Sequence, residues 1–221
     1  AIQLETWENS LPAHIKLAYL PSMGYIQLRL TAKSYLDISL LETELASFTQ
    51  TLRTTLKDLI IYEENILIEE FIANLLKESG LSISTAESCT GGNIAKTLTS
   101  VPGSSAYFKG SIVAYHREVK EKILQIPTEY IDTHGLVSLS VVEKMAEASL
   151  RLFNTDISLA TTGIAGPFSI EGEKEVGTVC IALASKNKTI SKEFHFGVKR
   201  ERNIVRSTIA ALVMLKEFLR D

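Results

Sequence analysis

From residue 65 onward, the chain alternates apolar runs of strand length with amphipathic segments of helical length. The apolar runs predict strands over residues 81–85, 110–115, 157–162, 176–184 and 189–196, and the amphipathic segments predict helices over 66–79, 88–100, 119–124, 138–153 and 199–219. Such alternation is typical of layered α/β proteins, in which helices cover both faces of one sheet. A polar turn rather than a helix joins the last two strands, which indicates a mixed sheet. We therefore expect a three-layer α/β/α sandwich with a mixed sheet.

Residues 1–63 have a different pattern, which predicts a small α+β module before the larger domain of residues 64–221. Alternating apolar residues with turn formers between them predict a hairpin over residues 14–31. Leucine and phenylalanine then recur every three or four residues, which predicts a helix over 37–57. We interpret the short apolar run at 59–62 as a third strand.

The composition is that of a folded protein without a general attraction to polyanions. The chain has 221 residues, of which 45% are hydrophobic and 22% charged, and its formal net charge is -3. These values exclude wholesale disorder, and the slight negative charge gives no field that would draw the chain onto nucleic acid or an anionic membrane. No apolar stretch reaches the length of a membrane span, so we expect no membrane association.

Cysteine usage and the first residues indicate the compartment. Cys89 and Cys180 lie far apart and form no C-x-x-C pair, which argues against a structural zinc site and against a disulfide framework. Residues 1–12 lack the basic and apolar regions of a signal peptide. We therefore expect a cytoplasmic protein that holds no metal. Because the first residue is Ala1 rather than Met, we also expect the chain to be a piece of a longer protein.

Residues 85–92, Thr-Ala-Glu-Ser-Cys-Thr-Gly-Gly, leave a predicted strand and open a predicted helix. The two glycines let backbone approach a ligand, and free amides at a helix start favour an anion or a developing oxyanion. Ser88 therefore has surroundings suited to a hydroxyl nucleophile. Cys89 is an alternative nucleophile, because the same helix start would lower the pKa of a thiol. The simpler interpretation makes Ser88 an ordinary N-cap and Glu87 a carboxylate that stabilises the helix start.

Tyr115 ends another predicted strand, and Lys120 follows it within the next predicted helix. A lysine that is desolvated in a cleft loses basicity and can act as a general base, with a tyrosine as proton relay. Serine, lysine and tyrosine together can thus activate a hydroxyl without histidine. The alternative is that Lys120 lies on a solvated helix face.

Residues 159–167 form an apolar strand that ends in a loop of small residues, where Thr162 and backbone amides could meet a phosphate or a carboxylate. The alternative is an ordinary tight exit from a buried strand. The polar turn at residues 102–105 is a weaker candidate for the same pocket. The sequence contains no Walker loop, no H-E-x-x-H and no G-x-S-x-G motif.

The segment at 85–92 resembles the signature of the C-terminal domain of the CinA family of competence- and damage-inducible proteins, which includes nicotinamide-nucleotide amidohydrolases. Further matching motifs follow in the family's order, namely Pro102–Ser105, Val113–Tyr115 with Lys120, Gly135–Ser138, Thr162–Pro167, Val176–Val179 and Arg202. Residues 1–62 resemble the family's KH-like middle module. The resemblance therefore covers nearly the whole chain.

This resemblance implies hydrolysis of the carboxamide of nicotinamide mononucleotide (NMN) to nicotinate mononucleotide and ammonia, with no metal and no cofactor. It assigns Ser88 as the nucleophile, Lys120 as its base and Tyr115 as an aid to proton transfer. It assigns substrate binding to Glu87, Thr90, Gly91, Gly92, Ser104, Ser105, Thr162, Gly163, Ala165, Gly166 and Arg202. It also implies a homodimer or a higher homo-oligomer.

The sequence departs from the family pattern near the predicted pocket. Phe168, Ser169 and Ile170 stand where the family usually has glycines, Glu175 stands where proline is common, and Arg117 stands where asparagine is frequent. Bulk in that loop would narrow the pocket. The alternative hypothesis is therefore a CinA-like binding or interaction protein whose amidase site has lapsed.

The KH-like module gives little reason to expect nucleic-acid binding. Gly24 is the only glycine before Gly80, so the module lacks the G-x-x-G loop with which KH domains clamp a nucleotide backbone. We interpret the module as a packing or dimerisation element and expect no nucleic-acid partner.

Overall fold

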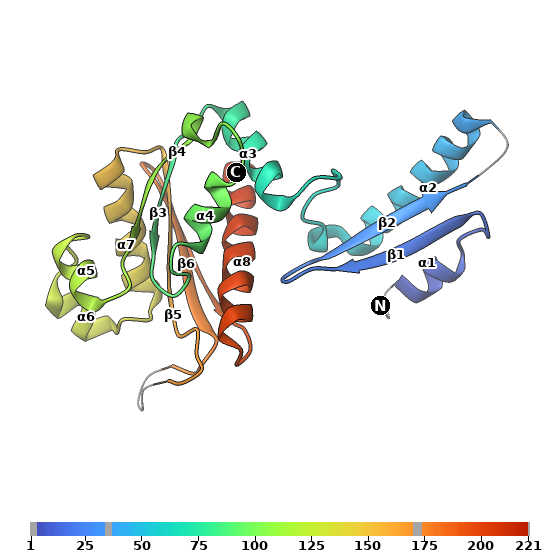
Figure 1. Cartoon of the computed structure of the whole chain (residues 1–221). Coiled ribbons are helices and arrows are strands. Elements are labelled where there is room, and N and C mark those ends of the chain that lie inside the picture. Colours follow the sequence, from blue (N-terminus) through green and yellow to red (C-terminus); the bar gives the residue numbers. More distant parts are fainter. Residues whose placement is uncertain (1–3, 34–36, 170–173, 221) are drawn as a thin grey trace. The chain divides into compact units, whose positions relative to one another are not determined.

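The computed structural model describes residues 4–33, 37–169 and 174–220, and the chain divides into two compact units, residues 1–64 and 65–221 (Figure 1). The division lies one residue beyond the boundary that the sequence pattern indicated. Within the described residues, a two-stranded sheet belongs to the first unit and a five-stranded sheet to the second. Each unit therefore has its own sheet.

The smaller unit contains the predicted hairpin and helix but a different third element. Its elements are α1 (Glu5–Asn9), β1 (Ile15–Pro21), β2 (Ile26–Ala32), α2 (Ile38–Leu56) and the 3₁₀ turn η2 (Lys57–Leu59). β1 and β2 pair antiparallel, as the hairpin prediction required. The strand predicted at 59–62 is wrong, because η2 ends at Leu59 and residues 60–62 form no strand in the described chain. Helix α1, which the sequence analysis missed, buries Trp7.

The larger unit is built on a mixed sheet with the strand order β4-β3-β5-β6-β7. The strands are β3 (Ile83–Glu87), β4 (Phe108–Val113), β5 (Ile157–Gly163), β6 (Thr178–Ser185) and β7 (Thr189–His195). β3 lies parallel to both β4 and β5, whereas β6 and β7 run antiparallel to their neighbours. The predicted mixed sheet is confirmed. The carboxyl ends of β3, β4 and β5 consequently meet at one end of the sheet, where α/β proteins gather ligands.

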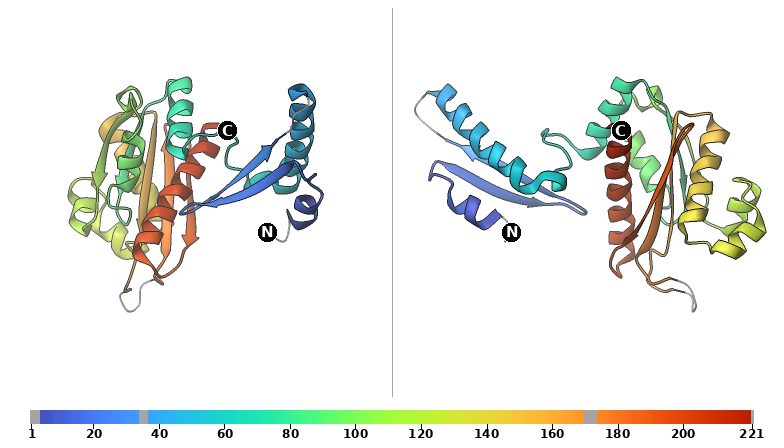
Figure 2. Two further views of the ribbon diagram at one scale, coloured as in Figure 1. Left: turned by 45° about the vertical axis from the view of Figure 1, so that its right-hand side comes forward. Right: turned by 180° about the vertical axis from the view of Figure 1, so that it is seen from behind.

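Helices cover both faces of this sheet and complete three layers (Figures 1 and 2). One layer holds α3 (Ile68–Ser79), α4 (Asn93–Thr99) and α8 (Arg200–Arg220), and the other holds α5 (Arg117–Lys122), α6 (Thr128–His134) and α7 (Leu139–Phe153). Both α7 and α8 pack against β5 and β6. The α/β/α sandwich is therefore confirmed, although α6 was not predicted and α4 begins five residues later than expected.

Local sequence signals explain where the main helices begin and end. Ser138 accepts a hydrogen bond from the Val141 amide at 3.2 Å and so caps α7. Gly80 adopts the left-handed conformation at φ 66° and ends α3, as its position predicted. No helix in the described part of the chain is long and apolar enough to cross a membrane.

Buried residues lie on both faces of the sheet, and one cluster lies between the sheet and α7. β5 and β6 are buried along nearly their whole length, which matches their continuous runs of apolar and small residues. A cluster of buried residues joins them to α7 and to the segment around α5 and α6, and it includes Ile131, Val141, Val142, Met145, Ala160, Cys180 and Ala182. The site end of the sheet is therefore held by packed side chains rather than by loops alone.

We expect Gly163→Ala to destabilise the larger unit, because β5 and β6 approach too closely there for a side chain. An added Cβ would lie 2.7 Å from the Thr178 carbonyl oxygen and 2.8 Å from a Val179 methyl group. Backbone cannot yield cheaply, so the free energy of unfolding should fall by about 1–3 kcal/mol, measured by urea denaturation. Gly197→Ala is the matched control, because no atom lies within 4 Å of its added Cβ. Equal stability of both variants would contradict this view of the β5–β6 contact.

Candidate active site

Ser88 lies on a tight turn between β3 and α4. Its amide donates to the Thr161 carbonyl at 2.9 Å and so continues the β3–β5 ladder by one residue. The chain then turns back, with the Gly91 amide donating to the Ser88 carbonyl at 3.1 Å, and Gly91 and Gly92 have φ values of 61° and 94°. Because α4 begins at Asn93, the interpretation of Ser88 as its N-cap is wrong. The glycines serve the turn, which presents Ser88 at the end of the sheet.

Glu87 is the last residue of β3, and its fully buried carboxylate lies at the amino end of α4. Its carboxylate accepts hydrogen bonds from the amides of Gly92, Ile94 and Ala95 at 3.0, 3.0 and 2.7 Å, and from the Thr90 hydroxyl at 2.8 Å. The amides that the sequence analysis offered to a substrate are therefore taken by a side chain of the protein. Glu87, Thr90, Gly91 and Gly92 shape the turn around Ser88 and do not line the pocket described below.

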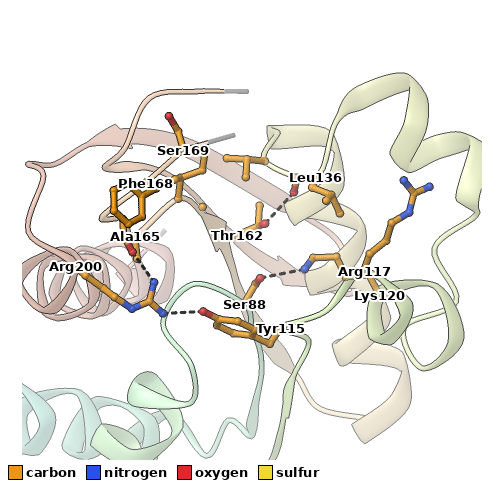
Figure 3. A pocket seen from close by; sticks show the side chains of 14 residues that line it. Ser88, Tyr115, Arg117, Lys120, Leu136, Thr162, Ala165, Phe168, Ser169 and Arg200 are labelled. Atoms are coloured by element: carbon orange, nitrogen blue, oxygen red, sulfur yellow. Dashed lines mark hydrogen bonds between the residues drawn. The ribbon is translucent and has the colours of Figure 1, made fainter. Parts of the chain in front are cut away.

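Lys120 reaches Ser88 from α5. Its Nζ atom donates to Ser88 Oγ at 3.0 Å (Figure 3) and to the Ala114 carbonyl at 2.7 Å. The residue is 2% exposed, and this burial lowers the pKa of the amine from its ordinary 10.5 to about 8. The alternative interpretation, in which Lys120 lies on a solvated helix face, is therefore wrong. A lysine that loses its proton near pH 8 beside a serine hydroxyl can take the proton of that hydroxyl.

Cys89 does not share this chemistry. It is 6% exposed, and burial raises the pKa of its thiol to about 12. The turn places it outside the set of residues that line the pocket. The alternative of a Cys89 nucleophile therefore lacks both a thiolate and access.

An open pocket of about 260 Å³ lies over Ser88 and Lys120 (Figure 3). Its lining mixes polar groups near Ser88 with apolar residues from the loops that follow β5 and precede α7. The lining residues are Ser88, Tyr115, Arg117, Lys120, Leu136, Val137, Thr162, Gly163, Ile164, Ala165, Gly166, Phe168, Ser169 and Arg200. The structure thus brings together the three predicted catalytic residues and the predicted loop residues Thr162, Gly163, Ala165 and Gly166.

Arg200, rather than the predicted Arg202, reaches the pocket. Arg200 donates to the Tyr115 hydroxyl oxygen at 2.7 Å and to the Gly166 carbonyl at 2.8 Å. Arg200 and Arg202 are two residues apart on α8, so they point to different sides of the helix. The sequence showed a cluster of arginines here, but only the helix register selects one of them.

Ser104 and Ser105 lie away from the site. They belong to the 3₁₀ turn η3 (Ser104–Ala106), which precedes the amino end of β4. Ser88, by contrast, follows the carboxyl end of β3, and the two strands are parallel. The two serines are therefore at the opposite end of the sheet from the pocket, and neither lines it.

Sequence reasoning also missed several apolar lining residues. Leu136 and Val137 were part of a motif noted before α7, but nothing in their chemistry marked them as pocket residues. Phe168 was expected to add bulk, and it is 86% exposed at the rim. Ile170 of the same loop lies outside the described residues. Among the described residues, no group of three histidine, cysteine, aspartate or glutamate side chains is placed to hold a metal ion.

Comparisons with known proteins agree on one family. A model of the CinA C-terminal domain matches residues 65–219. A CinA-like protein of Flavobacterium psychrophilum is 47% identical over all of this chain and 53% of its own length, and one of Cytophaga hutchinsonii is 36% identical over 97% and 51%. The chain therefore spans about half the length of these relatives.

Solved structures give the same result for the fold. The competence damage-inducible protein A (ComA) from Klebsiella pneumoniae has a TM-score of 0.67 at 32% identity, covering 69% of this chain and 95% of its own. The competence/damage inducible protein CihA from Agrobacterium tumefaciens has a TM-score of 0.65 at 34% identity, covering 72% and 100%. With its fold, its motifs and its relatives in agreement, the chain belongs to the CinA family.

Proposed function

We propose that the larger unit hydrolyses the carboxamide of NMN to nicotinate mononucleotide and ammonia, with Ser88 as nucleophile and Lys120 as its base. The observation that carries this proposal is the hydrogen bond of 3.0 Å between Lys120 Nζ and Ser88 Oγ at the floor of an open pocket. The family includes amidohydrolases of this substrate class, and the substrate itself is taken from that resemblance.

The proposed reaction has two steps. Ser88 Oγ bonds to the carboxamide carbon while its proton passes to neutral Lys120, and the protonated amine then gives that proton to the departing nitrogen, which leaves as ammonia. A water molecule next adds to the resulting ester, Lys120 accepts its proton, and the proton returns to Ser88 Oγ as nicotinate mononucleotide leaves. Each step returns Lys120 to its neutral state.

Two further groups are placed to assist. The Tyr115 hydroxyl accepts a hydrogen bond from Arg200, so its own proton is free to be donated towards the pocket. The Thr162 hydroxyl donates to the Leu136 carbonyl at 2.9 Å, so its oxygen is free to accept a hydrogen bond from a carboxamide N–H. One donor and one acceptor thus lie in the lining on which the substrate would rest.

The exposed position of Phe168 favours a working enzyme over a lapsed site. Its ring lies at the rim and leaves a volume of about 260 Å³ above Ser88. The bulk of the Phe168 ring therefore does not fill the pocket.

We expect Ser88→Ala to abolish ammonia release from NMN, with a loss of at least about a thousandfold in kcat. Ser105→Ala is the matched control, because it removes the same hydroxyl at the opposite end of the sheet. Coupled-enzyme detection of ammonia measures both. Undiminished turnover by the Ser88 variant would refute the nucleophile assignment, and no turnover by the unaltered, folded chain would refute the proposed reaction.

We expect kcat to rise with pH through about 8, because Lys120 must be neutral to accept the Ser88 proton and burial holds the pKa of its amine at about that value. A stopped assay from pH 6 to 10 measures this rising limb of the dependence of kcat on pH. The corresponding limb for an unperturbed lysine would lie above pH 10. A flat profile between pH 7 and 9 would contradict the role of Lys120.

We expect Lys120→Met to be inactive but more stable than the unaltered chain at pH 7. The pKa of the Lys120 amine is lower in the folded chain than its unfolded value of 10.5. At pH 7 the amine is charged in the unfolded chain, so burying it costs free energy of folding. This cost decreases as pH rises from about 8 to 10.5. Removing the amine should therefore raise the free energy of unfolding by an amount on the order of 1–3 kcal/mol at pH 7, with a smaller gain at pH 10. Urea denaturation at both pH values tests this, and a destabilised variant at pH 7 would contradict it.

A further inference from the structure

Lys120 is carried by a helix that is too short to hold it unaided. Among the described residues of α5, which has 6 residues, Lys120 is the buried one. Helices of this length are not stable by themselves in water. The position of Lys120 Nζ against Ser88 therefore depends on the contacts that fix α5 to the rest of the unit.

The carboxyl end of α5 is held by the core. Leu124 and Ile126 follow the helix and are buried in the same cluster as Ile131 of α6. The Ile126 amide also donates to the Lys120 carbonyl at 3.1 Å. Val119, within the helix, also packs against this cluster. These contacts fix the apolar side and the end of α5, and the polar groups of its first turn are held by other contacts.

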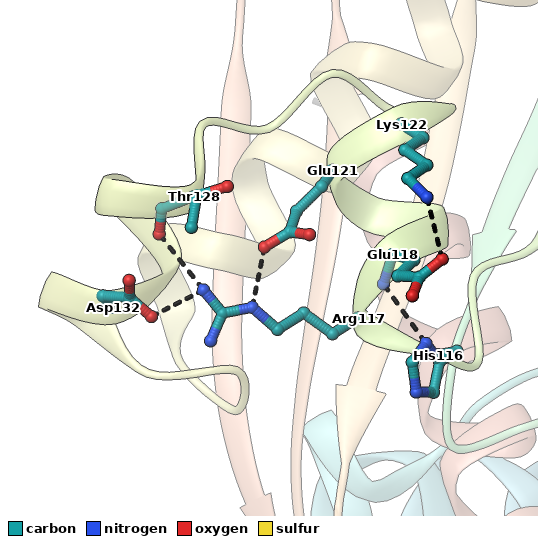
Figure 4. A network of polar contacts seen from close by, with 7 residues as sticks. All are labelled: His116, Arg117, Glu118, Glu121, Lys122, Thr128 and Asp132. Carbon is teal, nitrogen blue, oxygen red and sulfur yellow. Dashed lines mark hydrogen bonds and ion pairs between the residues drawn. The ribbon is translucent and has the colours of Figure 1, made fainter.

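Arg117 holds the first turn of α5 (Figure 4). Its Nε atom donates to Glu121 at 2.7 Å within α5, and its Nη2 atom donates to Asp132 at 2.5 Å and to the Thr128 carbonyl at 3.4 Å, both on α6. The N-cap contact of His116, which accepts from the Glu118 amide, is long at 3.4 Å. The guanidinium of Arg117 is thus the main polar link between the start of α5 and α6.

The charge of Arg117 is not directed at the substrate. Arg117 contributes to the pocket lining, but its guanidinium points away from Ser88 towards the two carboxylates (Figures 3 and 4). Its loss would leave the Glu121 and Asp132 carboxylates without this partner and α5 without this link to α6. Both facts place its effect on Lys120 rather than on a ligand.

We propose that Arg117 is a positioning residue for Lys120, because its guanidinium joins α5 to α6 and so fixes the turn that carries the lysine to Ser88. This inference rests on the role proposed above for Lys120. Isolated exposed ion pairs contribute little, but one rigid guanidinium with acceptors on two helices adds geometric restraint that a lysine cannot reproduce.

The chain offers a matched control on the same helix. Lys122 donates to Glu118 at 3.0 Å, one helical turn away, and this exposed pair does not join α5 to another element (Figure 4). Lys122→Gln removes one positive charge from α5, as Arg117→Gln does, but it breaks a single ion pair that lies within the helix, whereas Arg117→Gln breaks one pair within α5 and one to α6. A difference between the two variants therefore reports the link to α6.

We expect Arg117→Gln to lower kcat for NMN by about tenfold at pH 7.5, with KM changed less than about twofold. We also expect the rise of kcat with pH to occur at higher pH than in the unaltered chain. The rising limb of the pH–rate profile moves to higher pH because a looser α5 admits water to the Lys120 amine and so weakens the desolvation that lowers its pKa. The groups that face this amine are Ser88 Oγ, the Ala114 carbonyl and the neutral thiol of Cys89. Lys122→Gln should leave kcat, KM and the limb unchanged within about twofold.

A second readout separates this inference from the proposed function. In protein labelled with ¹³C-lysine, the Lys120 Cε resonance is assigned from its loss in Lys120→Met and titrated in each variant. We expect its midpoint to rise in Arg117→Gln and to stay in place in Lys122→Gln, whether or not the chain releases ammonia. Identical midpoints in the two variants would overturn the inference. If Arg117→Gln does not fold, Arg117→Lys, which keeps the charge but not the planar fork, decides by the same comparison.

Discussion

The burial of the Lys120 amine is the constraint on which the candidate site depends. In the described part of the chain no carboxylate pairs with it, and its hydrogen-bond partners are Ser88 Oγ and the Ala114 carbonyl. Glu87, a buried carboxylate beside Ser88, is satisfied instead by the amides at the amino end of α4 and by the Thr90 hydroxyl. If the two groups paired with each other, the lysine would be held in its charged form and could not accept a proton. Their separation leaves a base next to a hydroxyl.

The sheet supplies the geometry for this arrangement. Ser88 follows β3, Tyr115 follows β4, and Thr162 is the last residue but one of β5. Because these three strands are adjacent and parallel, their carboxyl ends converge. The antiparallel strands β6 and β7 contribute burial rather than chemistry, since they close the far side of the sheet. Arg200 then reaches the site from the first turn of α8 and ties the loop after β5 to Tyr115. Residues distant in sequence are thus brought to one pocket by strand order.

The sequence was sufficient to predict the features of the fold and site that depend on the order of the strands. It was not sufficient to predict which arginine of α8 reaches the pocket, because that depends on the register of the helix. Alternating elements and a turn-linked last pair of strands were enough for the mixed α/β/α sandwich, and small polar residues after three strands were enough for Ser88, Tyr115, Lys120 and Thr162 to be brought together. Arg202 was assigned from the family resemblance, whereas the register of α8 turns Arg200 towards the loop after β5. Ser104 and Ser105 were chosen because a polar turn looks alike at either end of a strand. Glu87 was predicted to serve substrate or helix, and only the backbone path of the turn selects the helix.

The central claim is that Ser88 forms an ester with the substrate, and hydroxylamine partitioning tests it most directly. Hydroxylamine is added at increasing concentration during turnover of NMN, and the products are separated by liquid chromatography with mass detection. If an acyl-enzyme intermediate forms, hydroxamate replaces nicotinate mononucleotide as the hydroxylamine concentration rises. The ammonia released then stays equal, in moles, to the sum of hydroxamate and acid formed. Ammonia release with the free acid as the sole product at every hydroxylamine concentration would indicate direct attack by water and would contradict the account.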